Sequence, residues 1–242
     1  MKKFRSVSFF LLVAQTLQAQ EYPADSAFTG SSLKYATYVY HTQRGEESAI
    51  FNGIIHEEYS ASIGGHAYFQ SPDWQKGSVM YGNILYEDLE MKYDLFKDQL
   101  IVTPHNPGAI AITLFNPRVE QFSFSTFKFI RIDKIGKNAS LSPGFYQQLI
   151  LGKLSVVLKR TKTISEKIIG TTFTQKFEET AKYYLLKEGI YYPVKTMKDI
   201  LAVVKDQKKE VRQFLADKKL KYRKNSGGTI IAISEFYNQS GK

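Results

Sequence analysis

Histidines and carboxylates are the side chains in this sequence whose types could support metal chemistry. The four histidines are His41, His56, His66 and His105, and two glutamates directly follow His56. Zinc sites need ligands at regular spacings, such as two histidines one helical turn apart, and none of the four shows such a spacing. We therefore predict no metal site and expect each histidine to lie at the surface or at the end of a strand.

A cluster of carboxylates between residues 87 and 98 is a second candidate. Paired carboxylates can serve as acid and base in hydrolysis, and larger groups can bind calcium. Apolar and acidic residues alternate along this segment, however, which predicts a half-buried strand with most carboxylates on its solvated face. A hydrolase that uses Asp88, Glu90 or Asp94 is therefore kept as an alternative. The cluster consists of Glu87, Asp88, Glu90, Asp94 and Asp98.

Nucleophilic catalysis finds little support in the sequence. There is no cysteine, and the G-x-S-x-G, H-E-x-x-H, P-loop, G-x-G-x-x-G and EF-hand motifs are absent. The spacing S-x-x-K occurs at Ser31/Lys34 and at Ser125/Lys128, but without the companion motifs of serine acyl enzymes. We predict no catalytic residue and no cofactor.

Charge is distributed unevenly along the chain. Residues 20–127 contain 6 basic and 13 acidic residues, whereas residues 128–242 contain 24 basic and 10 acidic residues. A run of like charges is either a solvated face that maintains solubility or a recognition surface for an anionic partner. The candidate binding surface consists of Lys208, Lys209, Arg212, Lys218 and Lys219.

The first nineteen residues predict export. Three basic residues lie within the first five, residues 6–14 are mostly apolar, and residues 17–19 resemble the cleavage site of a secretory signal peptide. The mature chain would begin at Gln20. Export excludes nucleic acid as a partner and favours an anionic envelope component or another envelope protein. No later stretch reaches the roughly 18 apolar residues of a spanning helix, so we expect no transmembrane helix after cleavage.

Residues 33–194 predict an antiparallel sheet, because short apolar or alternating runs are separated by Gly, Pro, Asn and Asp. From Ile84 to Leu95 the alternation is clearest, with Leu85, Leu89, Met91 and Tyr93 on one face. Turns are expected at residues 97–98, 125–126, 151–152 and 187–189. The stretch 161–182 has the weakest pattern, and there Thr163 and Glu166 could form the capping box of a short helix.

After Pro193 the apolar period changes from two residues to 3.6. Thr196 and Asp199 have capping-box spacing, and an apolar stripe follows at Met197, Ile200, Leu201 and Val204. Asp206 could cap a second helix with Val211, Phe214 and Leu215 on its apolar face. Beyond Gly227-Gly228, the segment from Thr229 to Tyr237 favours a third helix, with Ile230, Ile233 and Tyr237 on one side.

The predicted fold class is α+β: an antiparallel meander with a C-terminal helical segment packed on it, as layered domains require. The predicted regions are a signal peptide at 1–19, a β-rich domain at 20–194 and a basic helical segment at 195–242.

Three stretches together resemble a known group of proteins. They are DWQKGSV (73–79) leading into Leu85-Tyr86 and Tyr93-Asp94, KYY (182–184) with KEGIYYPV (187–194), and the lysine-rich helices after Thr196. With the leader, they resemble exported proteins of unknown function from Gram-negative bacteria of the Bacteroidota type. The resemblance spans most of the mature chain. It implies a cell-envelope setting and no particular site residues.

These patterns predict an exported, non-catalytic cell-envelope or secreted protein that binds a partner, with the basic C-terminal face as the contact surface. The predicted location is the periplasm, the outer membrane or the medium. One alternative is an envelope hydrolase that acts on glycan or peptide through carboxylates. The other is a periplasmic carrier of an apolar ligand, which would need a hollow apolar interior.

Overall fold

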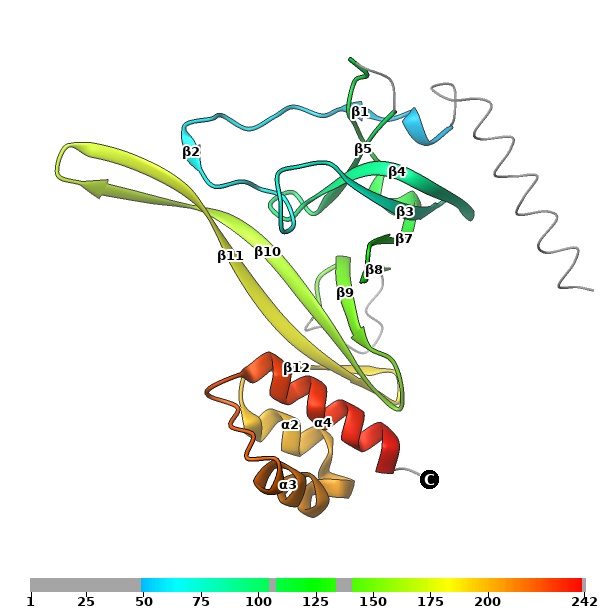
Figure 1. Cartoon of the computed structure of the whole chain (residues 1–242), viewed down its shortest axis with the longest axis vertical. Helices are drawn as coiled ribbons and strands as arrows, with labels where there is room; N and C mark the ends of the chain where they lie inside the picture. Colours follow the sequence, from blue (N-terminus) through cyan, green and yellow to red (C-terminus); the bar gives the residue numbers. More distant parts are fainter. Residues whose placement is uncertain (1–48, 105–107, 134–140, 241–242) are drawn as a thin grey trace, which may run out of the picture. The chain divides into compact units, whose positions relative to one another are not determined.

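Alternating apolar residues build a large, mostly antiparallel sheet, on which a C-terminal helical segment packs (Figure 1). The computed structural model describes residues 49–104, 108–133 and 141–240. The predicted leader, Ser31, Lys34, His41 and His105 lie outside these residues. The strands are β1 (Ile54–Ile55), β2 (Ile63–Gly64), β3 (Gln75–Tyr81), β4 (Ile84–Asp94), β5 (Gln99–Thr103), β6 (Ile112–Thr113), β7 (Val119–Phe124), β8 (Phe127–Ile132), β9 (Gly144–Ile150), β10 (Leu154–Ile169), β11 (Thr172–Lys187) and β12 (Ile190–Val194).

The sheet is a meander except for three pairings of strands that are not consecutive in the chain: β1 with β6, β3 with β7, and β2 with β11. Its strand order is β1-β6-β5-β4-β3-β7-β8-β9-β10-β11-β12, and β2 pairs in parallel with β11. The turns predicted at 97–98, 125–126, 151–152 and 187–189 all join paired antiparallel strands. Two single turns of 3₁₀ helix, η2 (Ala49–Phe51) and η3 (Asn116–Arg118), lie along the same path.

Strand β4 departs from the predicted alternation on both faces: Lys92 and Asp94, predicted on the solvated face, are buried, and the apolar face follows the prediction only in the second half of the strand. Its apolar residues from position 89 onward are buried as predicted, but Leu85 is exposed and Tyr86 is buried instead. The reason is a β-bulge, because the register against β3 shifts here and Asp88 adopts a φ of 54°. A bulge adds one residue to a strand, so the residues before it point to the face opposite to that predicted.

Aromatic rings fill the buried face of β3 to β9. Phe122 stacks on Phe129 at 4.8 Å between ring centroids, and Tyr93 lies edge-on to Phe122 at 5.0 Å and to Phe145 at 5.9 Å. Aromatic side chains bury large areas, so this cluster contributes much of the stability of the sheet. A carrier of apolar ligands would need a cavity where these rings are packed.

Strands β10 and β11 form a long hairpin of 16 residues in each strand. The prediction that Thr163 and Glu166 begin a short helix is wrong, because the two strands pair without interruption up to Ile169 and Thr172. Their neighbours β9 and β12 pair only with the end of the hairpin nearest Leu154 and Lys187. The hairpin therefore continues well beyond both neighbours (Figure 1).

The helical segment consists of α2 (Met197–Val203), a 3₁₀ turn η4 (Lys205–Gln207), α3 (Lys208–Asp217) and α4 (Ser226–Ser240). Their buried residues Ile200, Val211 and Ile233 form one cluster with Val156 of β10 and Leu185 of β11. All described residues belong to one compact unit within residues 38–242. In this part of the chain, no helix has the length and apolar character that crossing a membrane requires.

Of the two helix caps predicted for α2 and α3, the first is confirmed and the second is wrong. Thr196 and Asp199 form the predicted capping box, with the Thr196 backbone N–H donating to Asp199 Oδ2 at 2.8 Å. The prediction that Asp206 caps α3 is wrong, because α3 starts after Gln207 without a side-chain cap. The Asp206 carboxylate instead accepts hydrogen bonds from Lys187 and Tyr237.

The third helix, predicted from Thr229 onward, is α4, and Ile230, Ile233 and Tyr237 are buried as predicted. Gly227 and Gly228 lie in its first turn, although the sequence suggested that they separate it from the preceding helix. The helix starts earlier because Asn225 Oδ1 accepts a hydrogen bond from the Gly228 backbone N–H at 2.8 Å.

Candidate functional site

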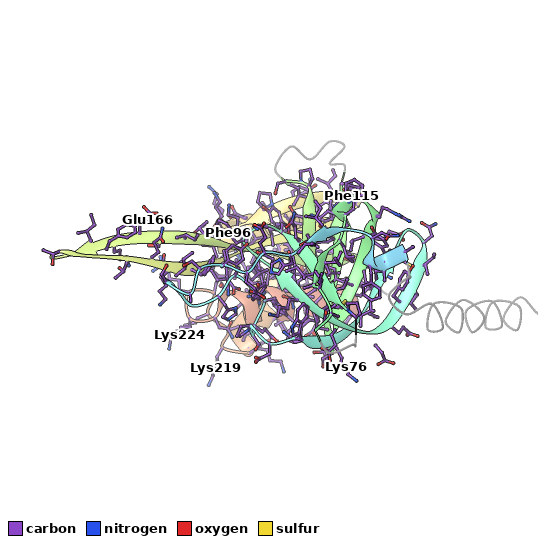
Figure 2. The ribbon with its side chains drawn as sticks, turned by 90° about the horizontal axis from the view of Figure 1, so that it is seen from above. Lys76, Phe96, Phe115, Glu166, Lys219 and Lys224 are labelled. Carbon is purple, nitrogen blue, oxygen red and sulfur yellow. The ribbon has the colours of Figure 1, made fainter. Side chains whose placement is uncertain are left out.

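The strongest candidate for a functional site is a basic surface formed by residues 205–224, which comprise η4, α3 and the segment leading to α4. Every basic side chain in this range is exposed. The prediction named five of them, and the structure adds Lys205 and three residues beyond α3; Figure 2 shows Lys219 and Lys224 projecting here. The basic surface consists of Lys205, Lys208, Lys209, Arg212, Lys218, Lys219, Lys221, Arg223 and Lys224.

The fold of α3 determines which side chains face the solvent. Val211 is completely buried and Leu215 is partly buried against the helical cluster, so one side of α3 is held against its neighbours. Helical geometry then turns Lys208, Lys209 and Arg212 outward. Their apolar stems can lie along the helix while the charged groups stay in water.

The cations of the basic surface lack acidic partners within the described ranges 49–104, 108–133 and 141–240. None of them forms an ion pair within 4.0 Å with any residue that the structure describes. Two of the three acids in the same range have other hydrogen-bond partners: Asp206 accepts from Lys187 Nζ at 2.7 Å and from the Tyr237 hydroxyl at 2.6 Å, and Asp217 accepts from Gln213 of the same helix at 2.8 Å.

The electrostatics of Asp206 explain why it does not neutralise the basic surface. Partial burial favours its protonated form, but the hydrogen bonds from Lys187 and Tyr237 outweigh this and hold the pKa of Asp206 below its usual value. The ionised carboxylate thus bonds to Lys187 of β11 and Tyr237 of α4, and not to a cation of α3. Nine basic and three acidic residues within residues 205–224 leave a strong local excess of positive charge.

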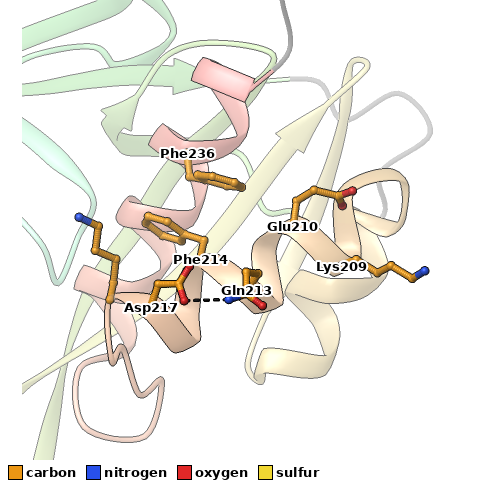
Figure 3. Close-up of a pocket in the computed structure, with 7 residues that line it drawn as sticks. Lys209, Glu210, Gln213, Phe214, Asp217 and Phe236 are labelled. Carbon is orange, nitrogen blue, oxygen red and sulfur yellow. Dashed lines mark hydrogen bonds between the residues drawn. The ribbon is translucent and has the colours of Figure 1, made fainter.

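A shallow hollow of about 550 Å³ lies beside this surface, between α3 and α4 (Figure 3). Phe214 of α3 stacks on Phe236 of α4, with 4.5 Å between ring centroids and 17° between the ring planes. Lys209 and Lys218 lie at its border, so apolar and cationic groups adjoin here. Phe214, predicted on the apolar face of α3, therefore lies at the margin of the helical segment rather than within its core.

A second polar cluster, which the sequence did not reveal, lies between residues 56–68 and β4. The Tyr68 hydroxyl donates to Glu58 Oε2 at 2.6 Å and therefore accepts from His56 Nε2–H at 2.8 Å. The His56 side chain is only 3% exposed, so of the two expected positions the surface is wrong, whereas the strand end is right, because His56 directly follows β1. Lys92 lies over the rings of Tyr68 and Trp74, at 4.7 and 4.6 Å from their centroids.

Burial sets the ionisation of this second cluster. It lowers the pKa of His56, and it raises the pKa of Tyr68 together with the hydrogen bond to Glu58. Burial opposes ionisation of Glu58, but the Tyr68 hydrogen bond and the charge of Lys92 bring the pKa of Glu58 below its usual value. At neutral pH His56 is thus a neutral imidazole, Tyr68 a protonated phenol and Glu58 a carboxylate. Their hydrogen bonds to one another and the contacts of Lys92 with Glu58 and Tyr68 fix residues 56–68 to β4.

The carboxylates proposed for hydrolysis do not meet at one place. Glu87 and Asp88 border a shallow hollow of about 350 Å³ together with Ser125, but neither Glu90 nor Asp94 lines it. Asp94 is buried, and its oxygens accept from the Tyr59 hydroxyl at 2.5 Å and from two backbone N–H groups of the following turn at 2.8 Å. Its role is to hold the turn after β4.

Asp98, the last member of the acidic cluster, forms a largely buried ion pair. Its carboxylate accepts from Lys159 Nζ and from the Tyr93 hydroxyl, each at 2.6 Å. Burial lowers the pKa of Lys159, and the Asp98 charge opposes that shift. The remaining histidine, His66, stacks on Tyr68 at 6.3 Å, and among the described residues no group of three or more His, Asp or Glu side chains is placed to hold a metal ion.

Comparison with known proteins identifies no relative of this chain. The chain matches no protein-family model, no curated protein and no solved structure. The inference of function therefore depends on the geometry of the basic surface.

Proposed function

We propose that this protein is an exported, non-catalytic envelope protein that binds an anionic partner through its basic surface. The charged and apolar leader supports export, and the resemblance to exported Bacteroidota-type proteins supports the periplasm, the outer membrane or the medium as its location. The partner is an anionic envelope component, such as an acidic glycan or an array of lipid headgroups, or an acidic protein.

One observation carries this proposal: the exposed cations of residues 205–224 have no acidic partners among the described residues. Like charges this close together repel one another, and an anionic partner relieves the repulsion while it gains attraction from all of them. Some cations elsewhere in the described chain are paired, as with Lys159 and Asp98 or Arg160 and Glu179.

The form of the basic surface indicates how it recognises its partner. Its cations stand on an exposed helix and a connecting segment rather than inside a cavity, so no single anion is enclosed. Such a surface binds by charge density, which suits an extended or repeating anion better than a small ligand.

The proposal can be tested by co-sedimentation of the purified protein with isolated bacterial envelopes. A variant with Lys208, Lys209, Arg212, Lys218 and Lys219 all changed to Gln should bind at least about tenfold more weakly, since each cation near an anionic surface contributes about 1 kcal/mol. Circular dichroism should show an unchanged fold, because all five side chains are exposed.

A matched control removes the same amount of charge from other parts of the chain. Five exposed lysines are changed to Gln in this control: Lys76, Lys128, Lys153, Lys182 and Lys195. Binding of the control should stay close to that of the wild type. Equal loss in both variants would show that only net charge matters, and no loss in the first would show that the basic surface is merely solvated.

A further inference from the structure

The end of the β10–β11 hairpin carries two large apolar side chains that the described part of the chain leaves uncovered. Ile168 is 75% exposed and Phe173 is 57% exposed. They are direct cross-strand partners, so their side chains adjoin on one face of the hairpin. Figure 2 shows Glu166 on the projecting part of the hairpin, at the level where β2 pairs with Gln175, so Ile168 and Phe173 lie beyond this last pairing.

The same end of the hairpin contains no charged side chains. Residues 168–175 read IIGTTFTQ, and the nearest charged residues on either side are Lys167 and Lys176. Lys176 is exposed, and Lys167 has only a long contact of 3.7 Å with Glu178, in which both side chains are well exposed. An exposed pair of this kind is weak, so both lysines are available to external anions.

The neighbouring residues of the described structure offer no apolar cover for the pair. Phe177, the next large apolar residue on this face, is already packed against Tyr59 at 5.3 Å and Phe96 at 5.8 Å between ring centroids. The hollow of about 380 Å³ beside Phe173 is lined mainly by polar side chains, including Ser62, Ser165, Lys167, Thr174, Gln175 and Glu178.

We propose that the hairpin end inserts into the interface of a lipid bilayer. An uncharged end that carries two exposed apolar side chains, with lysines behind it, matches the layers of a bilayer, because Ile168 and Phe173 can enter the acyl boundary while the ammonium groups contact headgroup phosphates. Four residues of strand measure about 13 Å, enough for the roughly 5–10 Å of this insertion. The pairing of the strands up to Ile169 and Thr172 also satisfies many backbone groups that would otherwise be buried unpaired.

This inference does not depend on the basic surface. Because insertion would also retain the five-residue Gln variant on envelope bilayers, the envelope test of the basic surface is run in an Ile168→Ser/Phe173→Ser background, and the two proposals can then fail separately. Vesicles of zwitterionic phosphatidylcholine carry no net charge and give the basic surface no counter-charge to attract it. Insertion of the hairpin end should occur in them nevertheless, and the five-residue Gln variant of the basic surface should insert as well as the wild type.

Tryptophan fluorescence reports insertion directly, because the chain has a single tryptophan, Trp74. In a Trp74→Phe background, Phe173→Trp should shift the emission to shorter wavelength and protect it from iodide when phosphatidylcholine vesicles are added. The matched control is Leu151→Trp in the same background, since Leu151 is 68% exposed at the β9–β10 turn. The emission of this control should not change.

Changing both apolar residues gives a second readout. The Ile168→Ser/Phe173→Ser variant should no longer sediment with these vesicles, while its urea midpoint should be nearly unchanged because both side chains are exposed. The proposal is overturned if the emission of the Phe173→Trp variant does not shift, if that of the Leu151→Trp control shifts equally, or if the double serine variant sediments like the wild type.

Discussion

At the scale of single residues, Tyr68 is the centre of the contacts that hold residues 56–68 in place. Its hydroxyl joins His56 to Glu58, and its backbone carbonyl accepts from Lys162 Nζ of β10 at 2.8 Å. Residues 56–62 have no helix or strand of their own, so these polar contacts replace the backbone pairing that regular structure would supply.

This network makes stability depend on pH in a direction that can be worked out. Burial holds the pKa of both His56 and His66 below the ordinary value, so the unfolded chain binds protons more readily than the folded one as the pH falls. Stability should be complete above about pH 6.5, the ordinary histidine pKa, and should decrease below it. The charged and titratable groups that influence His56 are Glu58, Asp94, Lys92 and Lys97.

We predict that the urea midpoint of the wild type falls between about pH 7.5 and about pH 5.5, and that His56→Gln reduces this fall. The glutamine amide can still donate to Tyr68 but does not titrate. Glu58 has a lowered pKa and ionises below this range, so it does not obscure the comparison. The same fall in the variant and the wild type would contradict the assignment to His56.

The residue scale is also where the sequence predicted least. His56, Tyr68 and Lys92 are separated by 12 and 24 positions in the chain, and no local spacing marks them as partners. The contact of Asp206 with Tyr237 spans 31 positions, and it removes the cap that local spacing predicted. Such contacts arise only from the tertiary fold, which periodicity does not encode.

At the scale of elements, α2 is the helix whose attachment to the sheet is easiest to test. Ile200 and Val204 are completely buried, whereas Met197 and Leu201, predicted in the same stripe, are only partly buried. Ile200→Ala should therefore lower the free energy of unfolding by about 2–5 kcal/mol, as in other cores. Urea denaturation measures this change.

The control for this test is Lys205→Ala, because Lys205 is exposed next to the same helix. It should change the free energy of unfolding by no more than about 0.5 kcal/mol. If Ile200→Ala were equally harmless, the helical segment would not be packed on β10 and β11, contrary to the structure.

Most elements could be predicted because their turns and caps are local. Ser125 adopts a φ of 48° and Glu188 and Gly189 adopt positive φ values at predicted hairpin turns. The distal part of β10 and β11 could not be predicted, because its apolar residues Ile168 and Phe173 are not buried and so do not mark a strand with one buried face. Its strand structure comes from pairing within the hairpin.

At the scale of the whole molecule, charge asymmetry is the property that connects sequence and proposed function. The sequence predicted the excess of positive charge in residues 128–242. The structure concentrates part of it on the exposed residues 205–224, whose cations form no ion pair with the residues that the structure describes. The sequence alone could not separate this group from cations that are paired, such as Lys187 with Asp206. That separation is the main contribution of the fold to the functional argument.

The salt dependence of envelope binding tests the central proposal most directly. The Debye length falls from about 8 Å at physiological ionic strength to about 3 Å at 1 M, so attraction between the basic surface and an anionic partner should be screened. To remove binding through the hairpin end, both proteins in this comparison carry Ile168→Ser and Phe173→Ser. We predict that co-sedimentation of the protein with an intact basic surface falls steeply across this salt series and that the five-residue Gln variant binds weakly at every concentration. Binding of the former that is unchanged by salt, or equal in the two proteins throughout, would contradict an electrostatic role for the basic surface.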